Sequence, residues 1–324
     1  MNTSTTPAFP QASSSFQQDS SSFPQDSSSF PRRRESSTPH FDFSEASLRE
    51  LAHADAARAL AEDVGTGDLT AALIDPARQA SARIVAREAA VICGAPWAQA
   101  TLQQVAPEAR MAWHVQEGQR CAVDQVVLTL TGPARTLLTA ERTVLNFLQL
   151  LSAVATQTAS FVQMVQGVPG SKAQIVDTRK TLPGLRLAQK YAVRTGGGVN
   201  HRIGLYDAVL IKENHIAAAG GIQAVLQRVA QVAPDASFVE IEVETLSQLQ
   251  EALDAGARMI LLDNFKLTDM REAVRLNAGR AILEVSGGVN RDTVRDIAAT
   301  GVDRISIGAL TKDIKAVDFS MRFS

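Results

Sequence analysis

Six short apolar runs in the second half of the chain set strong limits on its fold. The runs begin near Ala173, Ala208, Ser237, Met259, Ala281 and Arg304, at spacings of 35, 29, 22, 22 and 23 residues. Helical patterns separate them, as at Leu246–Ala255 and Asp292–Thr300. Near-continuous apolar strands that alternate with helices indicate a parallel sheet with both faces covered. Six clear strands, with one or two obscure ones, favour a closed or nearly closed α/β barrel over an open sheet.

Each apolar run is followed by polar residues or by glycine. Because the carboxyl ends of parallel strands converge on one face of a barrel, where active sites lie, we expect these residues to meet in one site. In chain order, the first two strands end in Asp177, Arg179 and Lys180 and in Lys212, Asn214 and His215; the third carries Glu240, Glu242 and Glu244; and the last three end in Asp263 and Asn264, in Ser286, Gly287 and Gly288, and in Gly308.

Positive charge is concentrated around three consecutive glycines, Gly196–Gly198. The segment Asp177–Arg202 holds six Lys or Arg residues, whereas the whole chain has 32 basic and 34 acidic residues. This concentration indicates a small ligand with several negative charges. The cations expected at the strand ends and next to the glycines are Arg179, Lys180, His201, Arg202 and Lys212.

The remaining strand ends predict a metal and a phosphate group in the same site. Glu242 and Asp263 supply hard oxygen ligands of the kind that bind Mg²⁺ together with substrate phosphates. Glycine-rich turns after late barrel strands, as at Ser286–Gly288 and Gly308, let backbone N–H groups approach a phosphate. Glu240, Glu242 and Glu244 alternate at strand period, so all three are expected to point into the barrel lumen or the site.

The first half of the chain predicts a separate α+β domain. Ser44 is placed to cap a helix over Ser44–Gly65, and strands are expected at Ala82–Ile92, Arg110–Val115 and Gln125–Leu130. Helical patterns cover Ala95–Val105 and the longer Ala134–Met164. Residues 1–40 are rich in serine, glutamine and proline and contain QDSSSFP twice, which predicts a disordered tail.

Composition excludes several classes of protein. A formal net charge of −2 gives no support for bulk attraction to nucleic acid or to an anionic membrane. No apolar run approaches the roughly 20 residues that span a bilayer, so no membrane association is expected. The two cysteines are too few for a disulfide scaffold. We expect a cytoplasmic protein.

Several segments together resemble quinolinate phosphoribosyltransferase, the carboxylating nicotinate-nucleotide pyrophosphorylase. The most specific is DTRKTLPGLRLAQKYAVRTGGGVNHRIGLYDAVLIKENH at Asp177–His215. EDVGTGDLT, ERTVLNFLQLLSAVAT, EIEVETLSQLQEAL, ILLDNF, LEVSGGV and ISIGALT extend the similarity from about Phe41 to the carboxyl terminus. The resemblance implies an amino-terminal α/β sandwich domain over residues 41–156 and an incomplete, open α/β barrel over 157–310. Residues 311–324 would form a carboxyl-terminal segment that packs back on the first domain.

The resemblance also implies a reaction and a role for each site residue. Quinolinate and phosphoribosyl pyrophosphate would give nicotinate mononucleotide, pyrophosphate and CO₂, in de novo NAD biosynthesis, with Mg²⁺ as cofactor. Lys180, Glu242 and Asp263 would be catalytic, and Lys180 would also contact pyrophosphate or carboxylate. Glu242 and Asp263 would position Mg²⁺ and the ribose hydroxyls. Arg142, Arg179, His201, Arg202 and Lys212 would hold the two carboxylates of quinolinate, and Ser286, Gly287, Gly288 and Gly308 would bind the 5′-phosphate.

The resemblance further implies a homodimer or a larger homo-oligomer with shared active sites, in which Arg142 belongs to the site of the neighbouring subunit. Lys312 stands where some relatives have histidine, a difference that would shift phosphate or pyrophosphate contacts. Three alternatives stay open at this point. The first is a related phosphoribosyltransferase for nicotinate or another heterocyclic carboxylate. The second is an aldolase in which Lys212 forms a Schiff base, and the third is a catalytically silent sensor of pyridine carboxylates.

Overall fold

Two large sheets of different kinds and a two-stranded one organise residues 41–324, which are the residues that the computed structural model describes. The expectation of a disordered tail over residues 1–40 lies outside the described residues. The first helix, α1 (Glu45–Asp63), begins where Ser44 accepts a hydrogen bond from the backbone N–H of Ser47, so the predicted cap is confirmed. The short 3₁₀ helix η1 (Ala71–Leu73) follows it.

The first sheet has four antiparallel strands in the order β12-β1-β5-β3. Its members are β1 (Gln79–Ala86), β3 (Arg110–Trp113), β5 (Val126–Pro133) and β12 (Phe319–Phe323). The apolar run predicted as one strand over Ala82–Ile92 is divided, because β2 (Ala90–Val91) leaves β1 and pairs with β4 (Arg120–Cys121). Helix α2 (Ala95–Val105) has the bounds that the sequence predicts. Ile84, Leu128 and Leu130 are fully buried in the core between this sheet and the helices.

The last strand of the chain belongs to this first sheet. Strand β12 pairs antiparallel with β1, from Ala82 opposite Phe323 to Ala86 opposite Phe319. The carboxyl-terminal segment therefore returns from the second sheet and completes the first one.

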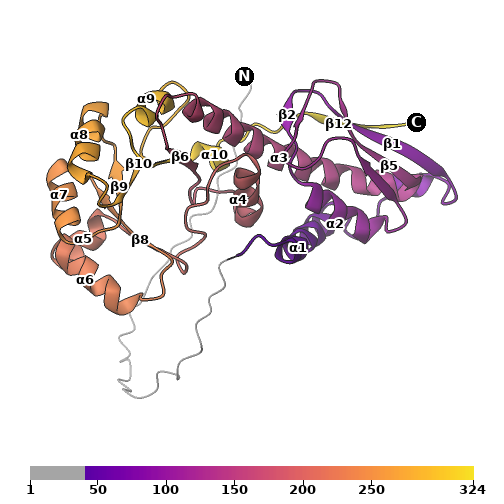
Figure 1. Cartoon of the computed structure of the whole chain (residues 1–324). Helices are drawn as coiled ribbons and strands as arrows, with labels where there is room; N and C mark the ends of the chain where they lie inside the picture. Colours follow the sequence, from indigo (N-terminus) through magenta and orange to yellow (C-terminus); the bar gives the residue numbers. More distant parts are fainter. Residues whose placement is uncertain (1–40) are drawn as a thin grey trace, which may run out of the picture. The chain divides into compact units, whose positions relative to one another are not determined.

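Helix α3 (Ala134–Gln166) contacts both sheets (Figure 1). Its first part buries Leu137 and Leu148 in the core of the antiparallel sheet. Its second part buries Leu151 and Phe161 in the core of the parallel sheet. One long amphipathic helix thus connects the two halves of the described chain.

All six apolar runs form parallel strands, as predicted. They are β6 (Gln174–Val176), β7 (Val209–Ile211), β8 (Val239–Val243), β9 (Met259–Asp263), β10 (Ile282–Ser286) and β11 (Arg304–Ser306), in the spatial order β6-β11-β10-β9-β8-β7. The sheet is open, with β6 and β7 as its edges, which confirms the incomplete barrel. Beside β6, Val199 forms a single parallel bridge with Val176 in place of a further strand.

Helices cover the outer side of these strands, as Figure 1 shows for α6 (Ile222–Val232), α7 (Leu246–Asp254) and α8 (Leu267–Asn277). The other helices of this half are α4 (Arg186–Thr195), α5 (Glu213–Ala219), α9 (Val294–Ala298) and α10 (Ala309–Lys312). The strands between the helices and the lumen bury Ile241, Ile260 and Leu262 completely. Over residues 41–324, no helix has both the length and the apolar character that a membrane crossing requires.

Candidate active site

Two adjoining cavities lie at the carboxyl ends of the parallel strands. One encloses about 530 Å³ and the other about 490 Å³. They share Thr178, Lys180, Asp263, Ser286 and Ser306, so they are two parts of one site. We call the first the cation cavity, because Arg179, Arg202 and Lys212 line it, and the second the glycine cavity, because Gly287, Gly288 and Gly308 line it.

The arginines of the cation cavity come from two segments on the β6 side of the sheet. Arg179 follows β6, and Arg202 follows the bridge that Val199 makes with Val176. Burial and the charge of Arg179 lower the pKa of Arg202, so the two like charges lie near each other. Arg179 Nε is buried and has no hydrogen-bond partner among residues 41–324. A buried donor without a partner is costly, so this arrangement favours an anionic ligand.

Lys212 directly follows β7, the other edge strand of the sheet, and lines the cation cavity. Its Nζ lies 3.1 Å from Glu242 Oε2, and its side chain is 47% exposed. A Schiff base requires an amine that is free to attack a carbonyl, whereas this side chain is engaged with a carboxylate. This pairing disfavours the Schiff-base alternative.

His201 lines the same cavity, but both of its ring nitrogens are engaged within the protein. Nδ1 accepts a hydrogen bond from the backbone N–H of Arg202 at 2.8 Å, so the ring proton belongs on Nε2, which lies 2.7 Å from Glu240 Oε2. Burial lowers the pKa of His201, which agrees with a neutral ring. In this structure His201 orients the backbone of Arg202 and offers no free N–H to a carboxylate.

Two buried glutamates lie next to His201, and one of them, Glu284, lines the cation cavity and pairs with Arg304. Glu240 and Glu284 have no exposed surface, and Arg304 Nε donates to Glu284 Oε2 at 2.7 Å. Burial raises the pKa of each glutamate to about 7. One oxygen of each, Oε1, has no hydrogen-bond partner in the described part of the chain.

The three alternating glutamates of β8 have different surroundings. Glu240 lies in the lumen and Glu242 in the cation cavity, as predicted. The prediction is wrong for Glu244, which is exposed, because β8 ends at Val243 and the chain turns toward the Thr245 cap of α7. Glu242 and Asp263 lie on neighbouring strands at the mouth of the site. Burial raises the pKa of Glu242, and the charge of Asp263 adds to that rise.

The glycine cavity is formed by turns that exclude side chains. Gly287 has φ of +97°, and a Cβ there would lie 2.2 Å from Asn264 Oδ1. A Cβ on Gly308 would lie 3.0 Å from Lys180 Cδ, so the absence of a side chain leaves room for that lysine. Lys312 also lines this cavity, with its Nζ 2.6 Å from Asp313. Backbone groups of such turns can approach a phosphate closely.

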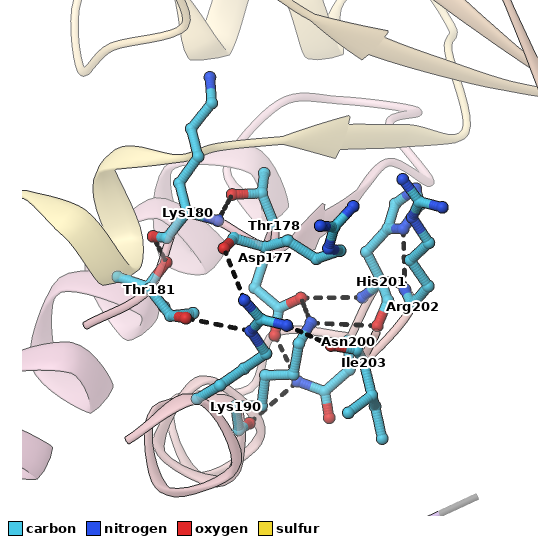
Figure 2. Close-up of polar contacts among 12 residues, drawn as sticks. Asp177, Thr178, Lys180, Thr181, Lys190, Asn200, His201, Arg202 and Ile203 are labelled. Atoms are coloured by element: carbon cyan, nitrogen blue, oxygen red, sulfur yellow. Dashed lines mark hydrogen bonds and ion pairs between the residues drawn. The ribbon is translucent and has the colours of Figure 1, made fainter. Parts of the chain in front are cut away.

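Asn264 and Thr178 also line the cavities. Asn264 lies in the site, as the strand-end pattern predicts; it has a left-handed backbone, with φ of 55°, and its Nδ2 donates to Asp263 Oδ2 at 2.8 Å. Thr178 is not among the predicted site residues, although its position directly after Asp177 at a strand end is a signal that could have indicated a role. Thr178 Oγ1 accepts from the backbone N–H of Lys180 at 3.1 Å and so shapes the turn after β6 (Figure 2).

Three of the six cations between Asp177 and Arg202 serve the fold, which corrects the view that their concentration serves a ligand alone. Lys190 is fully buried in an ion pair with Asp177. Arg186 donates to the backbone carbonyls of Arg179 and Ile203, and Arg194 lies over the ring of Phe43. Arg179, Lys180 and Arg202 remain as the cations of this segment that line the cavities.

Five of the strand-end residues expected to meet in the site line neither cavity in the described chain: Asp177 and Glu240 are fully buried, Asn214 and His215 are exposed on α5, and Glu244 is exposed after β8. Among the residues to which the resemblance assigns a role, the structure brings together all except Arg142. Arg142 is exposed on α3 and is absent from the residues that line the two cavities in the described chain. The others, from both cavities, are Arg179, Lys180, His201, Arg202, Lys212, Glu242, Asp263, Ser286, Gly287, Gly288 and Gly308.

Comparison with known proteins agrees with this geometry. Residues 68–152 match the family model "Quinolinate phosphoribosyl transferase, N-terminal domain", and residues 154–322 match the corresponding C-terminal domain model. The chain belongs to the quinolinate phosphoribosyl transferase family. Two curated relatives support the assignment over most of their length. The nicotinate-nucleotide pyrophosphorylase (carboxylating) of Mycobacterium leprae is 43% identical over 271 residues, which cover 82% of this chain and 94% of the relative. A probable enzyme of the same name from Bacillus subtilis is 40% identical over 260 residues, which cover 80% and 89%.

A solved structure extends the family assignment to the fold. The nicotinate-nucleotide pyrophosphorylase of Francisella tularensis superposes with a TM-score of 0.82 at 42% identity, covering 85% of this chain and 97% of that one. The open parallel sheet and the antiparallel sheet completed by β12 are therefore the fold of this family.

Proposed function

We propose that the protein transfers a phosphoribosyl group from phosphoribosyl pyrophosphate to quinolinate, with loss of one carboxylate as CO₂. The products are nicotinate mononucleotide, pyrophosphate and CO₂, and the reaction is a step of pyridine nucleotide synthesis. The observation that carries the proposal is the cation cavity, where Arg179 and Arg202 lie near each other and Arg179 Nε lacks a partner, next to a glycine cavity suited to phosphate.

Quinolinate matches the cation cavity because it carries two adjacent carboxylates on a flat ring. Arg179, Arg202 and Lys212 line one cavity of about 530 Å³, which also has the apolar walls Leu210 and Leu261. A ligand with one carboxylate would leave part of this positive charge without a partner in a partly closed site. The cavity therefore favours quinolinate over nicotinate.

Phosphoribosyl pyrophosphate matches the second part of the site. The turn at Ser286–Gly288 and the glycine at Gly308 would receive its 5′-phosphate. Lys180 lines both cavities, so its ammonium can reach the pyrophosphate or a carboxylate of the other substrate. Both substrates would then meet between Lys180, Asp263 and Ser286.

The chemistry requires orientation and charge more than covalent participation by the protein. The pyridine nitrogen attacks the anomeric carbon as the bond to pyrophosphate breaks, and positive charge develops on the ribose. The carboxylates of Glu242 and Asp263, at the mouth of the site, stabilise that charge electrostatically. The nitrogen becomes quaternary, and its positive charge then stabilises the carbanion left when the adjacent carboxylate departs as CO₂; a proton completes the product. Holding both substrates in one site lowers the entropic part of the barrier.

Glu242 and Asp263 also fit a magnesium ion by the chemistry of their donors. Two carboxylates on neighbouring strands suit a cation that keeps several waters and is shared with substrate phosphates. When bound there, Mg²⁺ would neutralise charge on the leaving pyrophosphate. Lys212, paired with Glu242 in this structure, would turn toward the carboxylates of quinolinate.

We further propose a homo-oligomer in which Arg142 completes the site of the neighbouring subunit. Arg142 is exposed on α3, as a residue that contacts a second copy would be in an isolated chain. A two-fold interface would bring this helix over the mouth of the other barrel.

A single assay separates the proposed function from its alternatives. Purified protein is mixed with phosphoribosyl pyrophosphate, Mg²⁺ and quinolinate carrying ¹³C in the carboxylate next to the nitrogen. We expect labelled CO₂ and nicotinate mononucleotide in equal amounts, and a kcat/KM at least 100-fold lower with nicotinate. Turnover of nicotinate without CO₂ would support the related transferase, and binding without turnover would support the sensor.

A further inference from the structure

The ion pair between Asp177 and Lys190 lies outside both cavities but directly behind the cation cavity. Both side chains are fully buried. Burial raises the pKa of Asp177 and lowers that of Lys190, while their mutual attraction opposes both shifts. Neither residue is among those that line the site.

This pair connects three segments of the chain, as Figure 2 shows. Asp177 Oδ1 accepts a hydrogen bond from Lys190 Nζ. At the same oxygen, Asp177 accepts a second one, of 2.9 Å, from the backbone N–H of His201. Its Oδ2 accepts from Asn200 Nδ2 at 2.6 Å. Lys190 Nζ also donates to the carbonyl oxygen of His201 at 3.1 Å. The end of β6, the middle of α4 and the segment after the glycine turn are thus held together by one carboxylate and one ammonium.

The segments joined in this way carry the two arginines of the cation cavity. Arg179 is two residues after Asp177, and Arg202 is two residues after Asn200. Arg186 of α4 reinforces the connection, because its guanidinium donates to the carbonyl of Arg179 at 3.5 Å and to that of Ile203 at 3.1 Å. The distance between the segments that carry Arg179 and Arg202 therefore depends on a buried hydrogen-bond network whose central ion pair does not line the cavities.

Stability alone is a weak explanation for such a pair. A buried ion pair loses hydration on both sides, and well-packed apolar residues of similar volume are often as stable or more stable. A polar network that is satisfied on all sides instead specifies one arrangement of the segments it joins. Asp177 is satisfied by Lys190, Asn200 and the His201 backbone.

We propose that Lys190, acting through Asp177, is a positioning residue that sets the spacing of Arg179 and Arg202 and so selects ligands with two adjacent carboxylates. This inference rests on the proposed function, because it assigns the spacing to quinolinate. The preference of the site for a ligand with two adjacent carboxylates would then depend on Asp177 and Lys190, which do not line either cavity.

The central experiment uses the double variant Asp177→Asn/Lys190→Met in the full-length protein. Each single variant leaves one uncompensated buried group and should lower the thermal midpoint, whereas the double variant should regain most of that loss. Affinity is measured by calorimetry with benzene-1,2-dicarboxylate, which carries the two carboxylates but cannot react, and with the 1,3-isomer. In the double variant we expect at least tenfold weaker binding of the 1,2-isomer and a smaller preference over the 1,3-isomer. The KM for phosphoribosyl pyrophosphate should change less than twofold.

Two further variants keep the test decisive. Asn200→Ala removes the bonds of Nδ2 to Asp177 Oδ2 and to the carbonyl of Lys190 but leaves the ion pair of Asp177 with Lys190 in place. It should therefore fold with a lower thermal midpoint, and it should also weaken binding of the 1,2-isomer. Asn277→Ala is the control, because Asn277 is buried at the opposite end of the sheet, where it bonds the backbone of Ala281. It should lower the thermal midpoint and leave affinity unchanged.

The outcomes separate this inference from the proposed function. If Asn200→Ala and the folded double variant bind the 1,2-isomer as wild type does, the positioning role is wrong. If Asn277→Ala weakens binding as much as they do, the effect follows stability and the inference is also wrong. Wild-type protein that binds the 1,2-isomer but does not convert quinolinate would contradict the proposed function and leave the positioning role to be judged by affinity.

Discussion

Arg202 offers the most direct test of whether the cation cavity binds the carboxylates of quinolinate. Its guanidinium lies near that of Arg179 in the cation cavity, so replacing it with alanine removes one partner of a carboxylate and, within the protein, one long hydrogen bond of 3.4 Å to the carbonyl of Ala208. We expect Arg202→Ala to keep its thermal midpoint and to lose on the order of 2–5 kcal/mol of transition-state stabilisation, measured as kcat/KM for quinolinate. Arg194→Ala, in the same segment but exposed on α4, is the matched control and should keep its kcat/KM. Near-normal kcat/KM in folded Arg202→Ala would contradict the assignment.

Glu284 predicts a pH dependence of stability. Burial raises its pKa from the ordinary 4.5 to about 7, and the charge of Glu240 adds to that rise. Between these pH values the folded state holds a proton that the unfolded chain has lost, so this contribution to stability is full below pH 4.5 and is lost as pH rises to about 7. The shift corresponds to roughly 3 kcal/mol as an upper value, because Glu240 titrates in the same network.

Glu284→Gln tests this dependence, since glutamine is neutral at every pH. Urea unfolding at pH 5, 6, 7 and 8 should show that wild type loses stability relative to the variant as pH rises, with little further change above pH 7. The variant also loses the bond to Arg304, which changes its stability at every pH. The quantity to compare is therefore the change in the free energy of unfolding with pH. Parallel stability curves would show that Glu284 is ionised throughout.

At the scale of helices and strands, the glycines before Arg202 have a steric role. Gly196 ends α4 with φ of −78°, and a Cβ there would lie 2.4 Å from the carbonyl oxygen of Ala155 in α3. Because that neighbour is backbone, α3 and α4 would have to separate. Gly196→Ala should therefore cost about 1–3 kcal/mol of stability and raise the KM for quinolinate.

A second glycine at a helix end supplies the control for this change. Gly167 ends α3 with φ of −74°, and a Cβ there would lie 3.4 Å from the nearest atom, the carbonyl oxygen of Gln163. Gly167→Ala should leave stability within about 0.5 kcal/mol in chemical unfolding. Equal effects of the two substitutions would mean that close approach of α3 and α4 is not the reason for Gly196.

The strands could be predicted from the sequence because their apolar runs are buried on both faces, as Ile260 and Leu262 show. The open edge could not be predicted from the runs alone, since closure depends on pairing between β6 and β7, which are far apart in sequence. Strand β12 has the mixed pattern of a half-exposed edge and depends on β1 for its definition. The ion pair of Asp177 with Lys190 lies within a cationic segment, and only the lone acid at Asp177 hints at it.

At the scale of the whole described chain, the site belongs to the parallel sheet, while the antiparallel sheet has no residue in the two cavities formed by residues 41–324. Helix α3 and strand β12 connect the two sheets by core packing and by strand pairing. Arg142 is exposed on α3, and the proposed homo-oligomer predicts that it reaches the barrel of a neighbouring subunit across a two-fold axis.

Subunit mixing decides whether Arg142 acts on its own chain or on its neighbour. Arg142→Ala and Lys212→Ala homodimers should each be almost inactive, because each pocket lacks one cation. In a mixed dimer with shared sites, both lesions fall in one pocket and the other pocket is intact. Half of the dimers in an equal random mixture are mixed and each has one intact site of two, so activity should recover to roughly a quarter of wild type. If each chain builds its own site, every pocket keeps one lesion and mixing restores nothing. Native mass spectrometry verifies exchange, and an inactive mixture after verified exchange would rule out the shared site.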